Sequence, residues 1–305
     1  MALDLLAARA AIERHCRRTP LVAAPALGNG VWLKLECLQR TGSFKLRGAC
    51  AALASTSARE VVTASAGNHG LGIALAARAL ARRATVFVPE TTPAVKRDGI
   101  AALGTEVRVA GTGYDHAEAA ARAWAAERSL PFVSPYDDEA VIFGNGGTTG
   151  EEILSQRPEV AQVVTPIGGG GLAAGLLGAL AGRGVVLAGV QPAQNCAMAE
   201  SLRLGRALTR YTGGPTLCEG LEGAVGERTY RALAAAGVEI TLVDDAAVRR
   251  AIGFAYREIG LVLEPSAAIG LAALREGLLE PRSPCVVIAT GANIEPDLLD
   301  QVLRQ

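Results

Sequence analysis

Lys45 follows the short turn Thr41-Gly42-Ser43-Phe44 and precedes a predicted helix of small residues. Only three lysines occur among the 30 Lys and Arg residues, so arginine serves wherever a cation alone is needed. A lysine amine can lose its proton and form a Schiff base, whereas arginine stays protonated. Lys45 is therefore a candidate nucleophile, with Arg47 as a cation close by. Considered alone, it also fits an ordinary lysine at the start of a helix.

The other two lysines lie in settings that predict surface positions. Lys34 belongs to a predicted strand over 31–36, where alternation places Lys34 and Glu36 on the polar face. Lys96 follows a proline at a polar helix start. We expect both lysines to be solvated charges.

Four consecutive glycines, Gly168 to Gly171, join an apolar strand to a predicted helix over 172–182. Glycine lets backbone N–H groups approach an anion closely, and the helix supplies its positive dipole end. The stretch lacks the Lys-Ser/Thr ending of a nucleotide P-loop and the spaced glycines of a dinucleotide-binding turn. It therefore predicts a site for the single phosphate of a compact cofactor, against the alternative of a flexible turn without a ligand.

Polar residues follow two further predicted strands. The segment Ser65-Ala66-Gly67-Asn68-His69 joins a strand to a helix, and its hydroxyl, amide and imidazole groups suit a carboxylate. A simple helix cap by Ser65 or Asn68 explains the same segment equally well. Thr290 ends the last predicted strand, where side chains of α/β sheets meet ligands, although by itself it would be read as a turn.

The overall composition fits a folded protein whose strands and helices could position such residues. A chain of 305 residues with 50% hydrophobic content and 36 glycines is long enough for two α/β units with many tight turns. Its 30 basic residues balance its 30 acidic ones, so charge gives no case for nucleic acid or an anionic membrane as partner.

Hydrophobic periodicity predicts alternating strands and helices, which is typical of a mostly parallel sheet. The segments 131–150 and 205–228 are irregular, and 131–150 is the candidate boundary between two lobes. The predicted strands cover 31–36, 60–64, 84–88, 105–109, 163–167, 184–191, 238–243 and 285–290. The predicted helices cover 3–17, 46–55, 69–82, 94–102, 114–127, 172–182, 196–204, 245–259, 266–276 and 295–304.

The six cysteines show no C-x-x-C pair and no paired histidine spacing, so we expect small core residues rather than a zinc site or a disulfide framework. The N-terminus carries an acid early and lacks the pattern of a signal peptide. No apolar stretch approaches the ~20 residues of a membrane span. These features favour a cytoplasmic protein.

With these motifs, the chain resembles the serine/threonine dehydratase group of fold-type II pyridoxal-phosphate enzymes, which also contains serine racemase and threo-3-hydroxyaspartate dehydratase. The resemblance covers nearly the full length, and its Ser-Phe-Lys-x-Arg-Gly-Ala signature is specific. It is carried by the segments 18–21, 34–36, 42–49, 65–69, 168–171, 264–268 and 290–293.

The resemblance implies a two-domain α/β fold similar to tryptophan synthase beta, with open, twisted parallel sheets and helices on both faces. A small mobile domain would cover 57–137, and a large cofactor-binding domain would cover 1–56 and 138–305. The protein would be a homodimer or homotetramer that binds pyridoxal 5'-phosphate and a small amino acid.

The resemblance also implies roles for individual residues. Lys45 would carry the cofactor and move protons at Cα. The expected cofactor contacts are Phe44, Lys45, Asn68, Gly168, Gly169, Gly170, Gly171, Leu172 and Thr290. The expected substrate contacts are Ser65, Ala66, Asn68, His69 and Glu264.

These parts favour loss of a β-hydroxyl. A hydroxyl at the pyridine nitrogen, the expected place of Thr290, does not favour protonation of that nitrogen. The ring is then a weaker electron sink, which suits prompt elimination. We hypothesise that Lys45 removes the Cα proton and that the cofactor phosphate protonates the departing hydroxide. The product then hydrolyses to a 2-oxo acid and ammonia.

Two departures from the family pattern concern the expected reaction and a metal site. In racemases of this group the matching loop resembles Ser-Ser-Gly-Asn-His. The second position here is Ala66, which has no proton to give. The metal site of many relatives resembles Glu-Pro-x-x-Ala-x-Asp, and the matching stretch here, 191–197, has lost both carboxylates. Neutral oxygens alone hold Mg²⁺ or Ca²⁺ poorly, so we expect no metal site.

Threonine or serine dehydratase is the first interpretation. A dehydratase of phenylserine or 3-hydroxyaspartate, or a serine racemase, is the enzymatic alternative. A catalytically idle amino-acid-binding protein is a further alternative, but it has no chemical need for a lysine amine at position 45.

Overall fold

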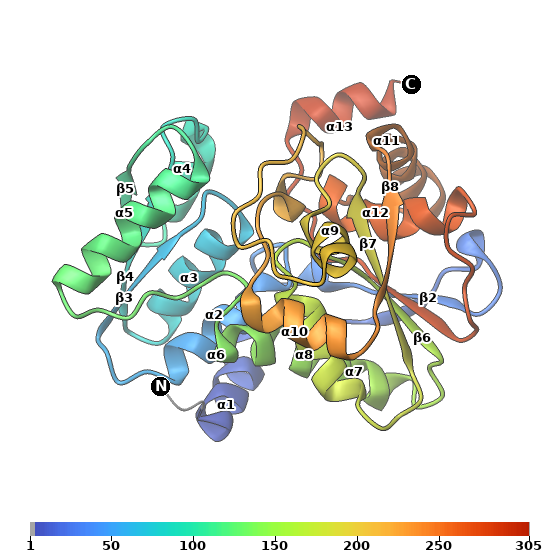
Figure 1. The fold of residues 1–305 in the computed structure, drawn as a ribbon, viewed down its shortest axis with the longest axis horizontal. Helices are drawn as coiled ribbons and strands as arrows, with labels where there is room; N and C mark the ends of the chain where they lie inside the picture. Colours follow the sequence, from blue (N-terminus) through green and yellow to red (C-terminus); the bar gives the residue numbers. More distant parts are fainter. Residues whose placement is uncertain (1–3, 305) are drawn as a thin grey trace. The chain divides into compact units, whose positions relative to one another are not determined.

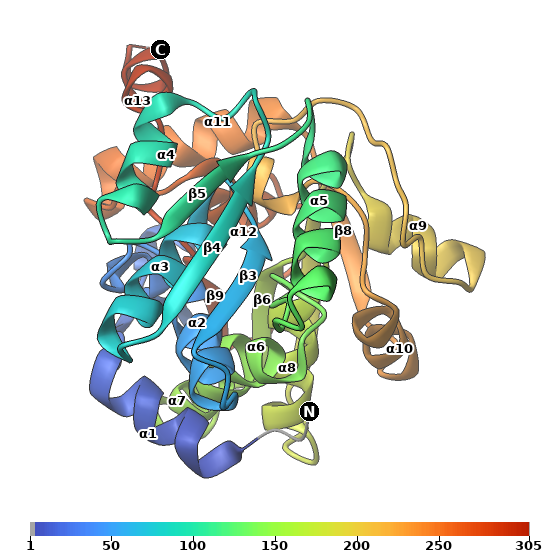
Figure 2. The ribbon, with the colours of Figure 1, turned by 90° about the vertical axis from the view of Figure 1, so that its left-hand side faces the viewer.

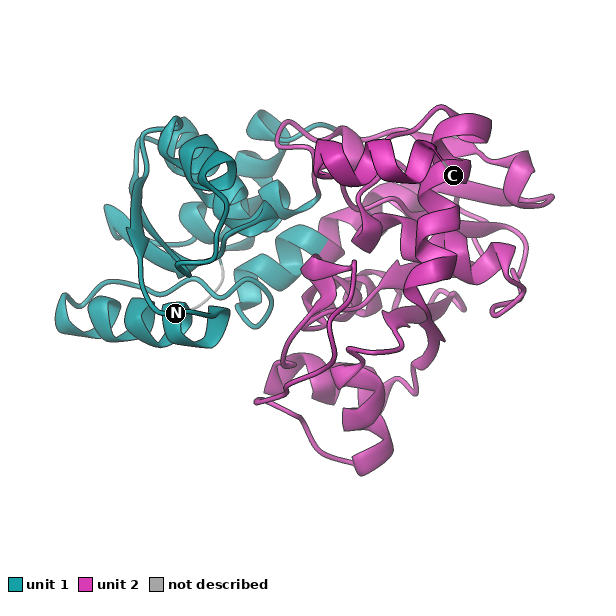
Figure 3. Ribbon diagram, turned by 90° about the horizontal axis from the view of Figure 1, so that it is seen from above, with its two compact units in different colours: residues 1–17, 44–145 teal, residues 18–43, 146–305 magenta. Residues whose placement is uncertain are grey.

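The computed structural model describes residues 4–304, and the chain divides into two compact units. Unit 1 comprises residues 1–17 and 44–145, and unit 2 comprises 18–43 and 146–305 (Figure 3). The predicted helix over 3–17 begins outside the described residues. The expectation of a mobile domain over 57–137 stays a prediction.

Unit 1 is built on a parallel sheet of three strands in the order β3-β4-β5 (Figure 2). Its strands are β3 Glu60–Ala64, β4 Arg83–Val88 and β5 Glu106–Val109. Its helices are α1 Leu5–His15, α2 Lys45–Ala54, α3 Asn68–Ala79, α4 Ala94–Ala101, α5 Tyr114–Glu127 and α6 Glu139–Ile142. A π-helical turn, η3 Phe143–Gly147, follows α6.

Alternation along the strands explains why helices cover both faces of this sheet. Val62 and Phe87 belong to a cluster with the alanines of α5. Val61 and Val86, the neighbours in sequence, belong to the cluster formed with α2 and α3. Successive strand residues point to opposite faces, so two apolar faces require two helical layers.

Unit 2 contains a six-stranded sheet in the order β1-β2-β9-β6-β7-β8 (Figure 1). All its pairings are parallel except that of β1 with β2. The strands are β1 Leu21–Ala23, β2 Val31–Lys34, β6 Gln162–Pro166, β7 Val186–Pro192, β8 Glu239–Val243 and β9 Cys285–Ile288.

The helices of unit 2 cover its sheet. Helix α12 packs on one face against Val164 and Val287, and α8 contacts β6 and β7 from the other face (Figure 1). The helices are α7 Thr148–Gln156, α8 Gly171–Leu180, α9 Ala197–Leu204, α10 Glu227–Ala235, α11 Asp245–Phe254, α12 Pro265–Arg275 and α13 Pro296–Leu303. Short helical turns are η1 Pro25–Leu27, η2 Glu36–Leu38, η4 Glu219–Leu221 and η5 Ala255–Ile259.

Strand β1 and helices α6, α7 and α10 are not among the strands and helices predicted from the sequence. Strand β1 has three residues and pairs with β2 alone, which is too short for a periodicity signal. Helix α10 follows the glycine-rich stretch that ends near 228, and only Thr229 and Leu233 of its residues are buried. A single buried pair at i and i+4 is a weak pattern, so tertiary packing defines this helix.

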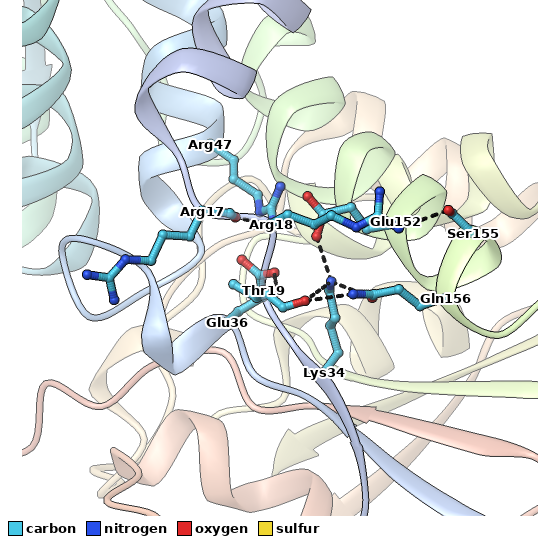
Figure 4. Close-up of polar contacts among 9 residues, drawn as sticks. All are labelled: Arg17, Arg18, Thr19, Lys34, Glu36, Arg47, Glu152, Ser155 and Gln156. Carbon is cyan, nitrogen blue, oxygen red and sulfur yellow. Dashed lines mark hydrogen bonds and ion pairs between the residues drawn. The ribbon is translucent and has the colours of Figure 1, made fainter.

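The prediction that Lys34 and Glu36 are solvated is wrong, because both side chains are fully buried. The Lys34 ammonium donates to the carbonyl of Thr19 at 2.9 Å and to the Glu152 carboxylate at 2.6 Å (Figure 4). It also donates to Oε1 of Gln156, and the Thr19 hydroxyl donates to Glu36. Strand β2 lies between two other strands and α7 supplies Glu152, so the polar face of β2 is covered by protein.

Five cysteines are buried, as expected for small core residues: Cys37, Cys50, Cys196, Cys218 and Cys285. Cys16 is partly exposed, and no disulfide joins any of the six cysteines, all of which lie within the described residues. No helix within residues 4–304 is both long enough and apolar enough to span a bilayer.

Candidate functional site

Lys45 is the first residue of α2, in unit 1, and its side chain is partly buried. Its Nζ donates to the backbone carbonyl of Pro135 at 2.9 Å and lies 5.2 Å from the centre of the Phe44 ring. The amine therefore leaves the helix end toward the segment that follows β5 and α5. A carbonyl acceptor holds it without neutralising its charge.

Close backbone packing fixes the start of α2. A Cβ atom at Gly72 of α3 would lie 3.2 Å from both the carbonyl carbon and the carbonyl oxygen of Lys45. The side-chain oxygen of Asn145 accepts the N–H of Gly48, one of the first N–H groups of α2, at 2.9 Å. Such N–H groups have no partner within their own helix, so Asn145 ties this turn down. Two independent contacts thus set the backbone from which Lys45 extends.

Arg47, the predicted cation near Lys45, is fully buried in α2. Its guanidinium donates to the backbone carbonyl of Arg17, just after the end of α1, at 3.2 Å (Figure 4). An influence of this cation on the Lys45 amine stays a prediction.

The loop from β3 to α3 carries the predicted carboxylate contacts. Helix α3 starts at Asn68, its N-cap residue is Gly67, and no side chain caps it. The Ser65 hydroxyl accepts the N–H of Gly67 at 3.2 Å. Neither Ser65 nor Asn68 therefore acts as the simple helix cap that the sequence left open. Ser65, Ala66 and Asn68 are all partly buried.

His69 is buried, with 2% of its surface exposed. Neither ring nitrogen makes a hydrogen bond of ordinary geometry with the described residues. Burial, and then the positive charge of Lys45, lower the pKa of His69 to about 3, which the nearby Val133 carbonyl opposes weakly. His69 is therefore a neutral imidazole at neutral pH. A buried polar ring without a partner costs free energy, which a polar ligand could recover.

The low pKa of His69 predicts a dependence of stability on pH. Below pH 6.5 the unfolded chain takes up a proton that the folded protein refuses until about pH 3. The contribution of neutral His69 is complete above pH 6.5 and is lost as the pH falls toward 3, by up to about 1.4 kcal/mol per pH unit. We expect His69→Asn to reduce the loss of unfolding free energy between pH 6.5 and pH 5 by about 2 kcal/mol in urea titrations.

The matched control for this measurement is His116→Asn, because His116 is exposed. That variant should lose stability with falling pH as the parent protein does. Identical pH dependence of the parent and His69→Asn would contradict a neutral, buried imidazole.

The four glycines lie in unit 2, at the N-terminus of α8. Gly170 is the N-cap residue and has φ +91°, in the left-handed region that favours glycine. A Cβ there would lie 2.7 Å from Met198 and 2.9 Å from Thr229. The Thr229 hydroxyl donates to the carbonyl of Gly169 at 2.6 Å. The turn is thus held in one conformation, and the free N–H groups of the first turn of α8, which includes Leu172, can receive an anion.

The other predicted residues of unit 2 connect to this turn through a short series of contacts. Gly168 packs against Gly220 and Leu221, and the N–H of Gly220 donates to the Ser266 hydroxyl at 3.1 Å. Ser266 lies in the first turn of α12, whose N-cap residue is Glu264.

Glu264 and Thr290 lie next to the same backbone segment. The Glu264 N–H donates to the carbonyl of Gly291 at 3.1 Å, and its carboxylate lies against Gly291. Thr290 precedes Gly291 in the chain, and both Glu264 and Thr290 are buried. The predicted site residues therefore form two groups, one on each unit.

Both groups fit the chemistry of pyridoxal phosphate. Unit 1 offers a lysine amine for the aldehyde, the Phe44 ring beside it and a polar loop with an unpartnered imidazole. Unit 2 offers a glycine turn whose N–H groups suit a phosphate and a buried hydroxyl at the end of a strand. The orphaned nitrogens of His69 and the constrained backbone of Gly170 are the observations that favour a ligand over a closed core.

The sequence reasoning did not find Asn145, Gly72 or Pro135, which contact Lys45 or the first turn of α2. Asn145 lies in the glycine-rich stretch of the irregular crossing, and its spacing from Gly48 gives no local signal. Only tertiary packing brings such residues to the start of α2.

Comparison with known proteins supports this interpretation. A family model described as pyridoxal-phosphate dependent enzyme matches residues 12–291. An L-threonine ammonia-lyase from Thermotoga maritima is 35% identical over 99% of this chain and 78% of its own length.

Two solved structures agree over nearly the whole fold. The processed form of threonine deaminase isoform 2 from Solanum lycopersicum has a TM-score of 0.89 and 31% identity, covering 98% of this chain and 86% of that one. Maize serine racemase has a TM-score of 0.88 and 27% identity, covering 100% and 98%. The predicted α/β fold of type II is confirmed, and the chain belongs to the family of pyridoxal-phosphate dependent enzymes.

Proposed function

We propose that this enzyme is a lyase that converts L-threonine, L-serine or both into the 2-oxo acid and ammonia by α,β-elimination. The observation that carries the proposal is the Lys45 amine at the start of α2, whose backbone at Lys45 packs against α3, the helix that begins at the carboxylate loop. The extensive identity to an L-threonine ammonia-lyase supports the same reaction class.

Each residue has a role in this proposal. Lys45 would hold the cofactor through its amine and would act as the base that takes the Cα proton. The cofactor supplies the electron sink that makes this proton acidic. Ser65, Asn68 and the N-terminal N–H groups of α3 bind the substrate carboxylate. His69 is neutral, so it can contribute a hydrogen bond there without adding charge.

The residues of unit 2 orient the cofactor. The turn from Gly168 to Gly171, with Leu172, binds its phosphate through backbone N–H groups. The Thr290 hydroxyl would serve the pyridine nitrogen of the cofactor, and Glu264 would be a substrate contact. Phe44, next to Lys45 in the chain, would contact the cofactor ring.

A substrate panel tests the proposal. Purified protein saturated with pyridoxal phosphate is incubated with L-threonine, L-serine, phenylserine and 3-hydroxyaspartate, and 2-oxo acid and ammonia are measured together. We expect equal amounts of both products, with L-threonine or L-serine turned over fastest. A preference for phenylserine or 3-hydroxyaspartate would reassign the substrate, and absence of both products from every amino acid would contradict the lyase.

Ala66 predicts little racemisation beside elimination, because its methyl group cannot deliver a proton to Cα. Chiral chromatography of a reaction with L-serine should show D-serine forming much more slowly than pyruvate. The matched variant is Ala66→Ser, which adds a hydroxyl at a partly buried loop position and should raise the ratio of D-serine to pyruvate. D-serine formed by the parent protein at a rate that rivals pyruvate would contradict the assigned role of Lys45.

Metal activation is not expected, because Gln191 and Asn195 use their amides within the protein. The Gln191 oxygen accepts the N–H of Ala199 at 2.9 Å, and the Asn195 oxygen accepts that of Gly223 at 3.1 Å. The described residues contain no cluster of three or more metal-binding side chains. Activity should therefore stay within about twofold after chelation and after addition of Mg²⁺. A large rate increase with Mg²⁺ would contradict this prediction.

We also propose that the enzyme acts in the cytoplasm as a homodimer or homotetramer. The sequence features that favour a cytoplasmic protein and the resemblance to the dehydratase group support this proposal. Light scattering coupled to size-exclusion chromatography measures the assembly directly, and a monomeric mass would contradict it.

A further inference from the structure

Two cysteines that are far apart in sequence lie side by side in unit 1. The Sγ atoms of Cys16 and Cys50 are 3.8 Å apart. Cys16 is the C-cap residue of α1, and Cys50 lies in the middle of α2. Neither residue belongs to the proposed cofactor or substrate site.

The two thiols differ in access to solvent and in their surroundings. Cys16 is partly exposed, whereas Cys50 is completely buried. Arg14 and His15 precede Cys16 and Arg17 follows it, and both arginines are exposed. Neighbouring cations favour the thiolate, the form of cysteine that reacts with oxidants. The negative end of the α1 dipole opposes this effect, but it amounts to about half a charge.

The geometry allows a bond between the two sulfurs. A disulfide needs about 2.0 Å between sulfurs, so the atoms must approach each other by about 1.8 Å. Cys16 has an extended backbone with φ −104° and ψ 159°, just beyond the last helical residue. Rotation of its side chain, and a small shift of this chain end, can supply the approach while Cys50 stays within its helix.

Other cysteines lack these properties. Burial raises the pKa of Cys37 and of Cys285 to about 12, and it raises that of Cys218 further. Cys196 is buried, and its sulfur lies 3.9 Å from the Tyr211 hydroxyl. Reactive cysteines combine access with a second thiol within reach, and Cys16 has both.

We propose that Cys16 and Cys50 form a reversible oxidation site whose oxidant is a peroxide. The Cys16 thiolate attacks one oxygen of the peroxide, the O–O bond breaks, and Cys16 becomes a sulfenic acid while water leaves. The Cys50 thiol then attacks the Cys16 sulfur, which forms the S–S bond and releases a second water. Both sulfurs are oxidised and both peroxide oxygens are reduced, and an external thiol reverses the reaction by exchange.

The disulfide would join α1 covalently to α2, the helix that begins at Lys45. Helix α1 packs on α2 and buries Ala8, Ala11 and Ile12 in the same cluster, so the new bond would add a covalent link at the C-terminal end of α1. Oxidants in solution would therefore determine whether α1 is covalently attached to α2.

The test uses the intact holoenzyme and a small excess of hydrogen peroxide. After quenching, the protein is denatured and alkylated, and its mass and peptides are analysed. We expect two fewer of the six thiols to be alkylated, a cross-linked peptide pair containing Cys16 and Cys50, and full recovery after dithiothreitol. Six alkylated thiols, or a disulfide that joins other cysteines or two chains, would overturn the proposal.

Three variants separate the steps. Cys50→Ser removes the resolving thiol, so the sulfenic acid at Cys16 should persist and react with dimedone several-fold more than in the parent protein. Cys16→Ser should show neither a disulfide nor dimedone labelling of Cys50. Cys196→Ser is the matched control and should lose two thiols like the parent. Equal dimedone labelling of Cys50 in Cys16→Ser would overturn the assigned order of reaction.

Discussion

Replacing Lys45 by alanine should abolish both the visible absorbance of the bound cofactor and the release of 2-oxo acid. The amine has two roles in the proposed reaction, as the covalent anchor and as the base at Cα, so its loss should lower the rate by at least about 10⁴-fold. The fold should survive, because the side chain, which donates to the carbonyl of Pro135, lies at a partly buried helix end. Absorbance spectroscopy, a product assay and circular dichroism measure the three quantities.

Two further variants show that the effect belongs to the amine at position 45. Lys45→Arg keeps a positive charge but cannot bond to the cofactor, so it should also lack absorbance and activity. Lys96→Ala, on helix α4, should retain both. If Lys45→Arg kept the parent activity, position 45 would serve only as a cation, and the proposed roles of Lys45 as covalent anchor and base would be wrong.

Replacing Gly170 by alanine should produce the second large effect, a loss of cofactor affinity. An alanine at φ +91° is strained by about 1–2 kcal/mol, and its Cβ would meet Thr229 and Met198 at less than 3 Å. The turn must move to relieve these contacts, and the N–H groups that it presents then lose their alignment. We expect the dissociation constant of pyridoxal phosphate to rise by about tenfold to a hundredfold.

Gly178→Ala is the matched control, because Gly178 lies in the same helix and a Cβ there would meet no atom within 4 Å. Its φ is an ordinary helical value, so alanine should leave affinity unchanged and stabilise the helix by about 0.5–1 kcal/mol. Titration of the cofactor-free forms with pyridoxal phosphate gives the comparison. Equal affinities of Gly170→Ala and Gly178→Ala would contradict the phosphate role of the glycine turn.

Local sequence signals defined much of the architecture. Strand β3 and helix α5 begin and end where the sequence predicted, at 60–64 and 114–127. In both segments the apolar residues recur with the period of the element, and turn residues at each end mark the same bounds. The motif around Lys45, the loop over 65–69 and the four glycines were also recognisable, because each depends on residues that are neighbours in sequence.

Long-range packing decided the features that the sequence could not show. Lys34 alternates like a surface residue, yet α7 brings Glu152 against it and the Lys34 side chain is fully buried. Asn145 reaches the first turn of α2 across 97 positions. Cys16 and Cys50 become neighbours only because α1 packs on α2.

The sequence by itself determined the family, the order of most strands and helices, and the residue types that could bind pyridoxal phosphate and an amino acid. The tertiary structure decided the charge of His69, the burial of Lys34 and Glu36, and the pairing of the Cys16 and Cys50 thiols. The physical reason is that periodicity reports which faces of an element are apolar or polar. Solvation, charge state and reactivity depend on which distant segment covers each face.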